Sequence, residues 1–374
     1  MLKNIDTWIG SYTAQTLRRL LSSREFAKPT HVMFCFVDHF EPDWKTTDKN
    51  LQRQRVERWV REYPALAQKH KDADGCSPKH TFFYPAECYT SEHFDLLRQL
   101  CQKNFGEVEI HLHHDNDTEE TLEQKLIQAK KDFSRHGFLG RRKLSGDVRF
   151  AFIHGNWALN NSRKDGCFCG VNDEAKVLAK VGCYADFTLP SAPSETQTRK
   201  INSIYYTKSS RHKPKSHDKG VDVTVGKFCN GDLMLIQGPL ALNWKIRKKG
   251  FFPAIENADI TGANHPTRQR VDLWVDQRIS VKDKEDWVFI KVHTHGAPEK
   301  NADALLGKPL DDMFSYLEEK YNDGRNFILH YVTAREMYNI VKAAEAKERG
   351  TPNEYRDYII ERPSVKTDEP RSFP

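Results

Sequence analysis

Short apolar segments alternate with amphipathic helical segments along most of this 374-residue chain, and that alternation restricts the folds it can adopt. The apolar segments have the length and the Val, Ile and Phe content of strands: 31–37, 81–84, 108–113, 148–153, 184–189, 233–236, 287–292 and 327–332. Strands that alternate with helices indicate a parallel sheet. Because the strands outnumber those of a compact two-layer domain and no clear linker divides the chain, we predict an α/β fold. Its architecture is expected to be a distorted (β/α) barrel of seven or eight mostly parallel strands.

The two ends of the chain differ from its middle, so we predict three parts. Residues 1–28 form an amphipathic helix with Trp8 and Leu20 on one apolar stripe, residues 29–348 form the barrel domain, and residues 349–374 form a charged tail that contains prolines. The helix is expected to pack across the domain. Peripheral contact with a membrane surface is the alternative role for its apolar stripe.

The composition excludes several classes of protein. Apolar residues make up 38% and aromatic residues 11% of the chain, which excludes intrinsic disorder. No apolar run reaches the roughly 20 residues that span a bilayer. The 58 Lys and Arg residues exceed the 52 Asp and Glu residues by only six, and the excess is scattered, so nucleic acid is not an expected partner.

The cysteines indicate a reducing compartment. The chain has eight of them and no export signal at its N-terminus, so we expect free thiols and a cytoplasmic protein, with peripheral placement at the inner face of the membrane as a variant. Cys167-Phe-Cys169 resembles half of a metal clip, but no second Cys pair follows it. Most cysteines are therefore interpreted as small hydrophobic residues.

Histidine and aspartate clusters directly follow several predicted strands. They are Asp38-His39, His113-His-Asp-Asn-Asp117, His154 and His293-Thr-His295. In a barrel of parallel strands the carboxyl ends open on one rim, so side chains far apart in the sequence converge there. The repeated placement of polar groups at strand ends is typical of an active site.

Three of these side chains form a plausible ligand set for a catalytic divalent metal. The candidate ligands are His39, His113 and Asp117. Two imidazoles and a carboxylate suit a metal with open positions, and Zn²⁺ is the expected ion. Asp117 equally fits a helix N-cap with Glu120 completing a capping box. Asp115 and His111 are the substitute ligands, and His111 would share a strand face with His113.

Proton transfer requires further groups near the metal. Asp38 is the candidate general base, because a carboxylate beside a metal can take a proton from water. In the alternative interpretation Asp38 is itself the metal ligand and His39 lies outside the metal's contacts. His293 follows an apolar strand and is the candidate acid for the leaving group, and His295 lies on the same strand face. One of these two histidines is predicted to be catalytic while the other orients it.

The turn from His154 to Trp157 is the candidate substrate site. His154 and Asn156 belong to this turn, whose backbone amides can stabilise an oxyanion, and the face of Trp157 suits a sugar ring. An aromatic plug over the barrel mouth is the alternative role for Trp157. Arg268 is a further candidate, for an anionic group of the substrate.

Four segments of the chain resemble the polysaccharide deacetylase (NodB-homology) family of carbohydrate esterases. They are Phe34-Cys-Phe-Val-Asp38-His39, Lys79-His-Thr-Phe-Phe-Tyr84, Glu109-Ile-His-Leu-His113-His-Asp-Asn-Asp117 and Ile290-Lys-Val-His293. The family has a strand ending in Asp-Asp, a Thr-Phe-Phe strand, a Glu-Ile-Gly-x-His-Thr-x-x-His segment and a late Leu-x-His. Their order and approximate spacing agree across about residues 31–335.

The resemblance implies roles for individual residues. By position, the family's base becomes Asp38, its metal-binding aspartate becomes His39, its metal-binding histidine pair becomes His113 and Asp117, and its acid becomes His293. The family's Asp-His-His ligand set thus becomes His-His-Asp, with the same ligand types in exchanged places. The Arg-x-Pro-Tyr segment of the family has no clean match in this chain.

The resemblance also implies an activity. It indicates a metal-dependent hydrolase that removes an acetyl group from an N-acetylated sugar or polysaccharide precursor, in the synthesis of a surface polysaccharide. Two alternatives remain. The chain is a non-catalytic barrel that binds a glycan or a partner enzyme, or it is a glycosidase of the same superfamily with a nucleophilic carboxylate such as Asp186.

Overall fold

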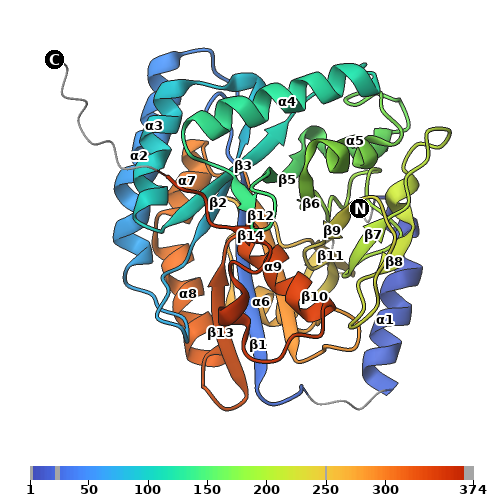
Figure 1. The fold of residues 1–374 in the computed structure, drawn as a ribbon. Coiled ribbons are helices and arrows are strands. Elements are labelled where there is room, and N and C mark those ends of the chain that lie inside the picture. Colours follow the sequence, from blue (N-terminus) through green and yellow to red (C-terminus); the bar gives the residue numbers. More distant parts are fainter. Residues whose placement is uncertain (1–2, 22–25, 249–250, 366–374) are drawn as a thin grey trace.

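The computed structural model describes residues 3–21, 26–248 and 251–365 (Figure 1). Its α-helices are α1 (Ile9–Leu21), α2 (Lys49–Ala67), α3 (Ser91–Gln102), α4 (Glu119–Arg135), α5 (Glu174–Val181), α6 (Arg268–Val275), α7 (Glu299–Leu305), α8 (Lys308–Tyr321) and α9 (Ala334–Glu345). The strands of the first half are β1 (Thr30–His39), β2 (His80–Pro85), β3 (Gly106–Leu112), β4 (Gly140–Arg142), β5 (Val148–His154) and β6 (Cys183–Asp186). Those of the second half are β7 (Ile204–Thr207), β8 (Gly220–Asp222), β9 (Met234–Ile236), β10 (Ala241–Lys248), β11 (Phe252–Glu256), β12 (Trp287–Thr294), β13 (Phe327–Val332) and β14 (Ile360–Glu361).

The strands form a mostly parallel sheet in the order β12-β1-β2-β3-β5-β6-β9-β7-β8. β13 joins it beside β1, while β4 and β14 extend from β5. The pairs from β12 to β9 are parallel, and the pairs of β7 with β8 and β9 are antiparallel. The predicted α/β class and parallel sheet are therefore confirmed.

Closure of the sheet into a barrel is not shown. The sheet has twelve strands in the described part of the chain, more than the seven or eight predicted, and there β12 and β8 at its two ends do not pair with each other. The four additional strands, β4, β7, β8 and β14, are short, and two of them lie in the irregular middle of the chain, where β7 and β8 form an antiparallel pair. The sequence of this middle part has no regular spacing of apolar residues from which β7 and β8 could have been predicted.

The two faces of the sheet are buried in different clusters, which β1 shows most clearly. Val32, Phe34 and Phe36 point to a cluster with helices such as α2, α3 and α4, and we call this side the outer face. The intervening residues Met33 and Cys35 point to a second cluster that includes α9, and we call this side the inner face. Successive strand residues point to opposite sides, so a strand covered on both faces is apolar throughout.

The N-terminal helix is shorter than predicted. α1 covers Ile9–Leu21 and is anchored by Trp8 and Tyr12, which pack with Leu240 and Leu242 near the β10–β11 hairpin. Leu20 is 74% exposed. No helix in the described ranges is long and apolar enough to cross a membrane.

Part of the predicted tail packs against the body of the protein. β14 pairs with β4, and the Arg356 guanidinium forms ion pairs with Asp72, Asp74 and Glu336. Residues 366–374 of the predicted tail, and residues 1–2 and 22–25 of the predicted N-terminal part, lie outside the described residues.

Candidate metal centre

Two histidines and a glutamate meet on the inner face at the carboxyl ends of β1 and β3. His39 is the last residue of β1, His111 lies one residue before the end of β3, and Glu41 follows β1 in the next turn. One ligand atom from each lies within 4.8 Å of the others, and all three residues are buried. We call His39, Glu41 and His111 the rim group. The alternation explains the grouping, because the odd-numbered residues of both strands point to the inner face.

Glu41 and His111 face each other across a single hydrogen-bond distance. His111 Nδ1 donates to the Ile153 carbonyl oxygen at 2.9 Å, so Nδ1 carries the proton and the Nε2 lone pair points elsewhere. That Nε2 lies 3.2 Å from Glu41 Oε1. Burial raises the pKa of Glu41 to about 7 and lowers the pKa of His111 to about 3. A divalent cation at this place would replace the proton that the Glu41 carboxyl can share with His111 Nε2.

The donor set of the rim group fits a divalent metal. Two imidazoles and one carboxylate are used by zinc enzymes and by non-haem iron enzymes, with positions left open for reactants. The hydrogen bond from His111 to a backbone carbonyl is the usual way in which a metal-binding histidine is oriented. The rim group can therefore hold a metal ion.

His113 lies on the solvent side of the rim group and is held by Glu87. His113 Nδ1 and its backbone N–H both donate to Glu87 Oε1, at 2.6 Å and 3.2 Å. The Nε2 atom lies 3.5 Å from Glu41 Oε1, and 33% of the side chain is exposed. Burial alone would lower the pKa of His113, but the hydrogen bond and the charge of Glu87 outweigh burial and raise it.

Aromatic rings surround the rim group. His295 stacks on His39 with ring centroids 4.6 Å apart, and Trp157 lies 6.2 Å from His39 and 6.1 Å from His295. Trp44 lies 5.5 Å from His295 and is 39% exposed. Burial is the main cause that lowers the pKa of His295. These partly exposed rings connect the buried ligands with solvent.

Asp38 is fully buried and both of its carboxylate oxygens have partners. Oδ2 lies 2.8 Å from His80 Nε2, and Oδ1 accepts from the backbone N–H of Gly296 at 2.6 Å. A Cβ at Gly296 would lie only 2.1 Å from Asp38 Oδ2, so glycine is required for this close approach. Asp38 thus holds the chain directly after His295.

His293 is also buried, on the inner face of β12. Its ring centroid lies 6.5 Å from that of His39, and burial lowers its pKa well below the usual range. Its Nδ1 has no hydrogen-bond partner within the described ranges. Of the two candidates for proton transfer, His295 is the one that is closer to His39 and partly exposed.

In the structure Asp117 does not lie beside His39. The Asp117 carboxylate binds His114 Nδ1 at 2.9 Å and Lys125 Nζ at 2.7 Å, and the carboxylate beside His39 belongs to Glu41. The predicted N-cap role of Asp117 is wrong as well. The N-cap of α4 is Thr118, whose side chain accepts from the backbone N–H of Thr121.

The predicted substrate residues separate in the structure. His154 is buried in a second group with His114, Cys169 and Glu174. Asn156 is exposed, and its φ of 55° turns the chain so that Trp157 approaches the rim group. Arg268 begins α6 at the surface.

Arg268 has partners away from the rim group. Its guanidinium lies over the ring of Tyr316 and 3.4 Å from a carboxylate oxygen of Glu319, both on α8. Its side chain is 71% exposed. The arrangement is that of a surface ion pair on the helices.

Three glutamates of these groups were missed in the sequence. Glu41 lies in the polar turn after β1 and Glu87 lies two residues after β2, so the strand-end argument used for the histidines would also have identified them. Glu174 begins α5, and no strand end marks it.

Comparison with known proteins adds no relative: no protein-family model matches the chain, and no curated protein matches it.

Proposed function

We propose that the protein is a metal-dependent hydrolase that removes an acetyl group from an N-acetylated sugar or polysaccharide precursor. The observation that carries the proposal is the rim group, where His39, Glu41 and His111 converge at strand ends beside partly exposed histidines. The sequence resemblance described above supplies the expected substrate class.

The chemistry requires a metal, a proton acceptor and a proton donor. His39, Glu41 and His111 are the residues that would hold the metal. When bound, a divalent ion supplies Lewis acidity toward water and toward the acetyl carbonyl. The side chains around the rim group supply the proton transfers.

His295 and His113 are suited to opposite proton transfers. Burial lowers the pKa of His295, so its ring is neutral near pH 7 and accepts a proton from attacking water. Glu87 raises the pKa of His113 against the effect of burial, and we assign this ring as the proton donor to the departing amine. Environments that separate the pKa values of two such groups define an acid and a base.

Asp38 acts as a positioning residue in this scheme. Its two oxygens are engaged by His80 and by the Gly296 N–H, so the carboxylate fixes the backbone next to His295. Trp157 and the exposed face of Trp44 offer flat apolar surfaces for a sugar ring.

The glycosidase alternative has less support. Its candidate nucleophile, Asp186, is 1% exposed, and its two oxygens accept from the Thr188 N–H and hydroxyl at 3.0 Å and 2.7 Å. Burial raises the pKa of Asp186 to about 7. A retaining glycosidase instead needs an ionised carboxylate open to the sugar.

The test is acetate release from N-acetylglucosamine oligomers by zinc-loaded protein. We expect His39→Ala to lower the rate by at least roughly a hundredfold, since it removes a ligand rather than an outer contact. The control is His212→Ala, which changes an exposed histidine in the loop after β7 and should leave the rate unchanged. Sugar release without acetate would indicate the glycosidase, and an unchanged rate in His39→Ala would refute the assignment of the rim group.

A further inference from the structure

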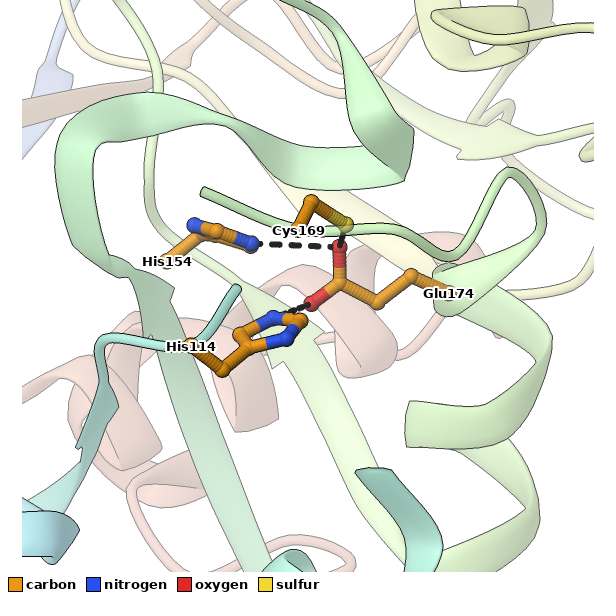
Figure 2. A group of neighbouring side chains, drawn as sticks. All are labelled: His114, His154, Cys169 and Glu174. Carbon is orange, nitrogen blue, oxygen red and sulfur yellow. Dashed lines mark hydrogen bonds and ion pairs between the residues drawn. The ribbon is translucent and has the colours of Figure 1, made fainter. Parts of the chain in front are cut away.

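We propose a second metal site, a structural zinc site formed by His114, His154, Cys169 and Glu174, which is independent of the proposed hydrolase function. These residues come from the segment after β3, the end of β5, the loop before α5 and the first residue of α5 (Figure 2). One ligand atom from each lies within 4.8 Å of the others, and all four residues are buried. We call them the loop group.

The ligand atoms of the loop group lie close enough together for one zinc ion, with the two histidines facing different oxygens of Glu174. Bond lengths of about 2.0–2.3 Å place neighbouring ligand atoms roughly 3.3–3.8 Å apart. His114 Nε2 lies 3.1 Å from Glu174 Oε1, while His154 Nε2 and Cys169 Sγ each lie 3.4 Å from Glu174 Oε2. Figure 2 shows these atoms pointing toward the same carboxylate from different sides.

Both imidazoles are oriented as metal ligands are. His114 Nδ1 donates to the Asp117 carboxylate at 2.9 Å, and His154 Nδ1 donates to the Gly155 carbonyl oxygen. The His154 ring therefore carries its proton on Nδ1, and both rings direct Nε2 toward Glu174. At His114, where a carboxylate lies beside each nitrogen, a bound cation would replace the Nε2 proton. This arrangement gives Asp117 a supporting role at the loop group.

The Nε2 atom of His154 independently indicates a cation-binding place. His154 is fully buried, and within the described ranges this atom has no hydrogen-bond partner. Its lone pair points toward a carboxylate oxygen of Glu174, so two acceptors face each other at 3.4 Å. A buried acceptor without a donor is costly, and a cation between the two atoms removes that cost.

The sulfur of Cys169 lies among amide donors. The backbone N–H groups of Asn161 and Val171 point at Sγ from 3.3 Å and 3.5 Å. These donors favour a thiolate, which is the form that binds metal, whereas burial and the charge of Glu174 raise the pKa of the Cys169 thiol, so the thiolate forms only together with the bound cation. One thiolate and one carboxylate balance the charge of Zn²⁺ in a buried place, and binding releases the thiol proton to solvent.

The ligands and their burial indicate a structural zinc ion. Sulfur together with imidazole selects zinc over calcium or magnesium, which prefer oxygen ligands. Four protein ligands without solvent access form a closed site, whereas the rim group opens to solvent through half-exposed rings. The loop group therefore binds zinc for stability.

The consequence is a fixed path for residues 158–173, which contain no α-helix or strand. Zinc would tie Cys169 in this segment to His154 at the end of β5 and to Glu174 at the start of α5. Gly170 shows how tightly the segment packs: its φ is +98°, and a Cβ there would lie 2.6 Å from the Asp117 carbonyl oxygen.

Cobalt substitution tests the proposal in the intact chain. Purified protein is stripped with a chelator and reloaded with Co²⁺, and the near-ultraviolet charge-transfer band of a cobalt–thiolate bond is recorded. We expect the band in wild-type protein and in Cys167→Ser, a matched control two residues from Cys169 that changes an exposed thiol. Cys169→Ser should lose the band and one equivalent of bound metal.

The outcomes separate the two metal sites. His39→Ala should lose a different metal equivalent and keep the cobalt–thiolate band, whether or not the protein is a hydrolase. No band in wild-type protein, or loss of the band in Cys167→Ser, would overturn the proposal. These two measurements remain decisive even if Cys169→Ser does not fold, because they use wild-type protein and Cys167→Ser, which is altered only at the surface.

Discussion

Substitutions of Asp38 decide whether this carboxylate positions the site or transfers a proton. Asp38→Ala removes the acceptor for the Gly296 N–H and leaves His80 Nε2 buried without its partner. Asp38→Asn keeps an oxygen for Gly296, and His80 Nε2 accepts its amide N–H when the imidazole proton moves to Nδ1. The two variants thus differ in hydrogen bonding but both lack a carboxylate base.

The expected loss of stability in each variant follows from the burial of Asp38. Breaking a buried pair by removing one partner costs about 3–5 kcal/mol. With an unfolding entropy of about 2.1 cal/mol/K per residue, Asp38→Ala should lower Tm by about 4–6 °C for a chain of this length. Asp38→Asn exchanges a charged hydrogen bond for a neutral one at about 1–2 kcal/mol, which lowers Tm by about 1–3 °C.

The rates separate the two roles. If Asp38 only positions the chain beside His295, Asp38→Asn loses at most roughly 30-fold in kcat, even when its whole cost enters the barrier. Loss of a general base costs about 10²–10⁴-fold. Thermal unfolding and acetate release are measured on the same preparations, with Asp283→Asn as the exposed control. An Asn variant with nearly wild-type Tm and a rate below one hundredth would refute the positioning role.

Two further predictions concern pH. Burial lowers the pKa of His31 to about 4, so below pH 6.5 the unfolded chain binds a proton that the folded chain does not; the free energy of unfolding should fall by roughly 2–3 kcal/mol between pH 7 and pH 4.5. His31→Gln should reduce that slope in urea unfolding, and an unchanged slope would contradict this assignment to the buried His31–His330 pair. Glu87→Gln removes the charge that raises the pKa of His113, so the alkaline limb of the kcat profile should move to lower pH with metal content unchanged. An unmoved limb would exclude His113 as the proton donor.

Most of the fold was predictable because the spacing of the apolar residues and the turn and capping residues between the segments indicate the same helices and strands. The predicted strand at 327–332 is β13, and Thr333 and Glu336 form the capping box with which α9 begins. The β10–β11 hairpin was missed, because its strand residues include exposed aromatic and basic side chains such as Trp244. A strand with one exposed face and no regular alternation of apolar and polar residues is difficult to predict from the sequence.

The candidate site was only partly predictable, because neighbouring residues in the sequence can direct their side chains to different places in the structure. His113 and His114 are neighbours, yet His113 joins Glu87 near the rim group and His114 joins the loop group. His111 and His39 share the inner face, which follows from strand alternation. The partners of these histidines lie in turns and at a helix start, where no period fixes the direction of a side chain.

The position of β1 has a consequence for biosynthesis. This strand pairs along one edge with β12 and along half of the other with β13, which lie far toward the end of the chain. At a translation rate of about 5–20 residues per second, β1 waits roughly 10–50 s after leaving the ribosome before those partners are made. Its unpaired apolar edge is meanwhile open to other nascent chains, so a chaperone that covers such edges should raise the yield of soluble protein.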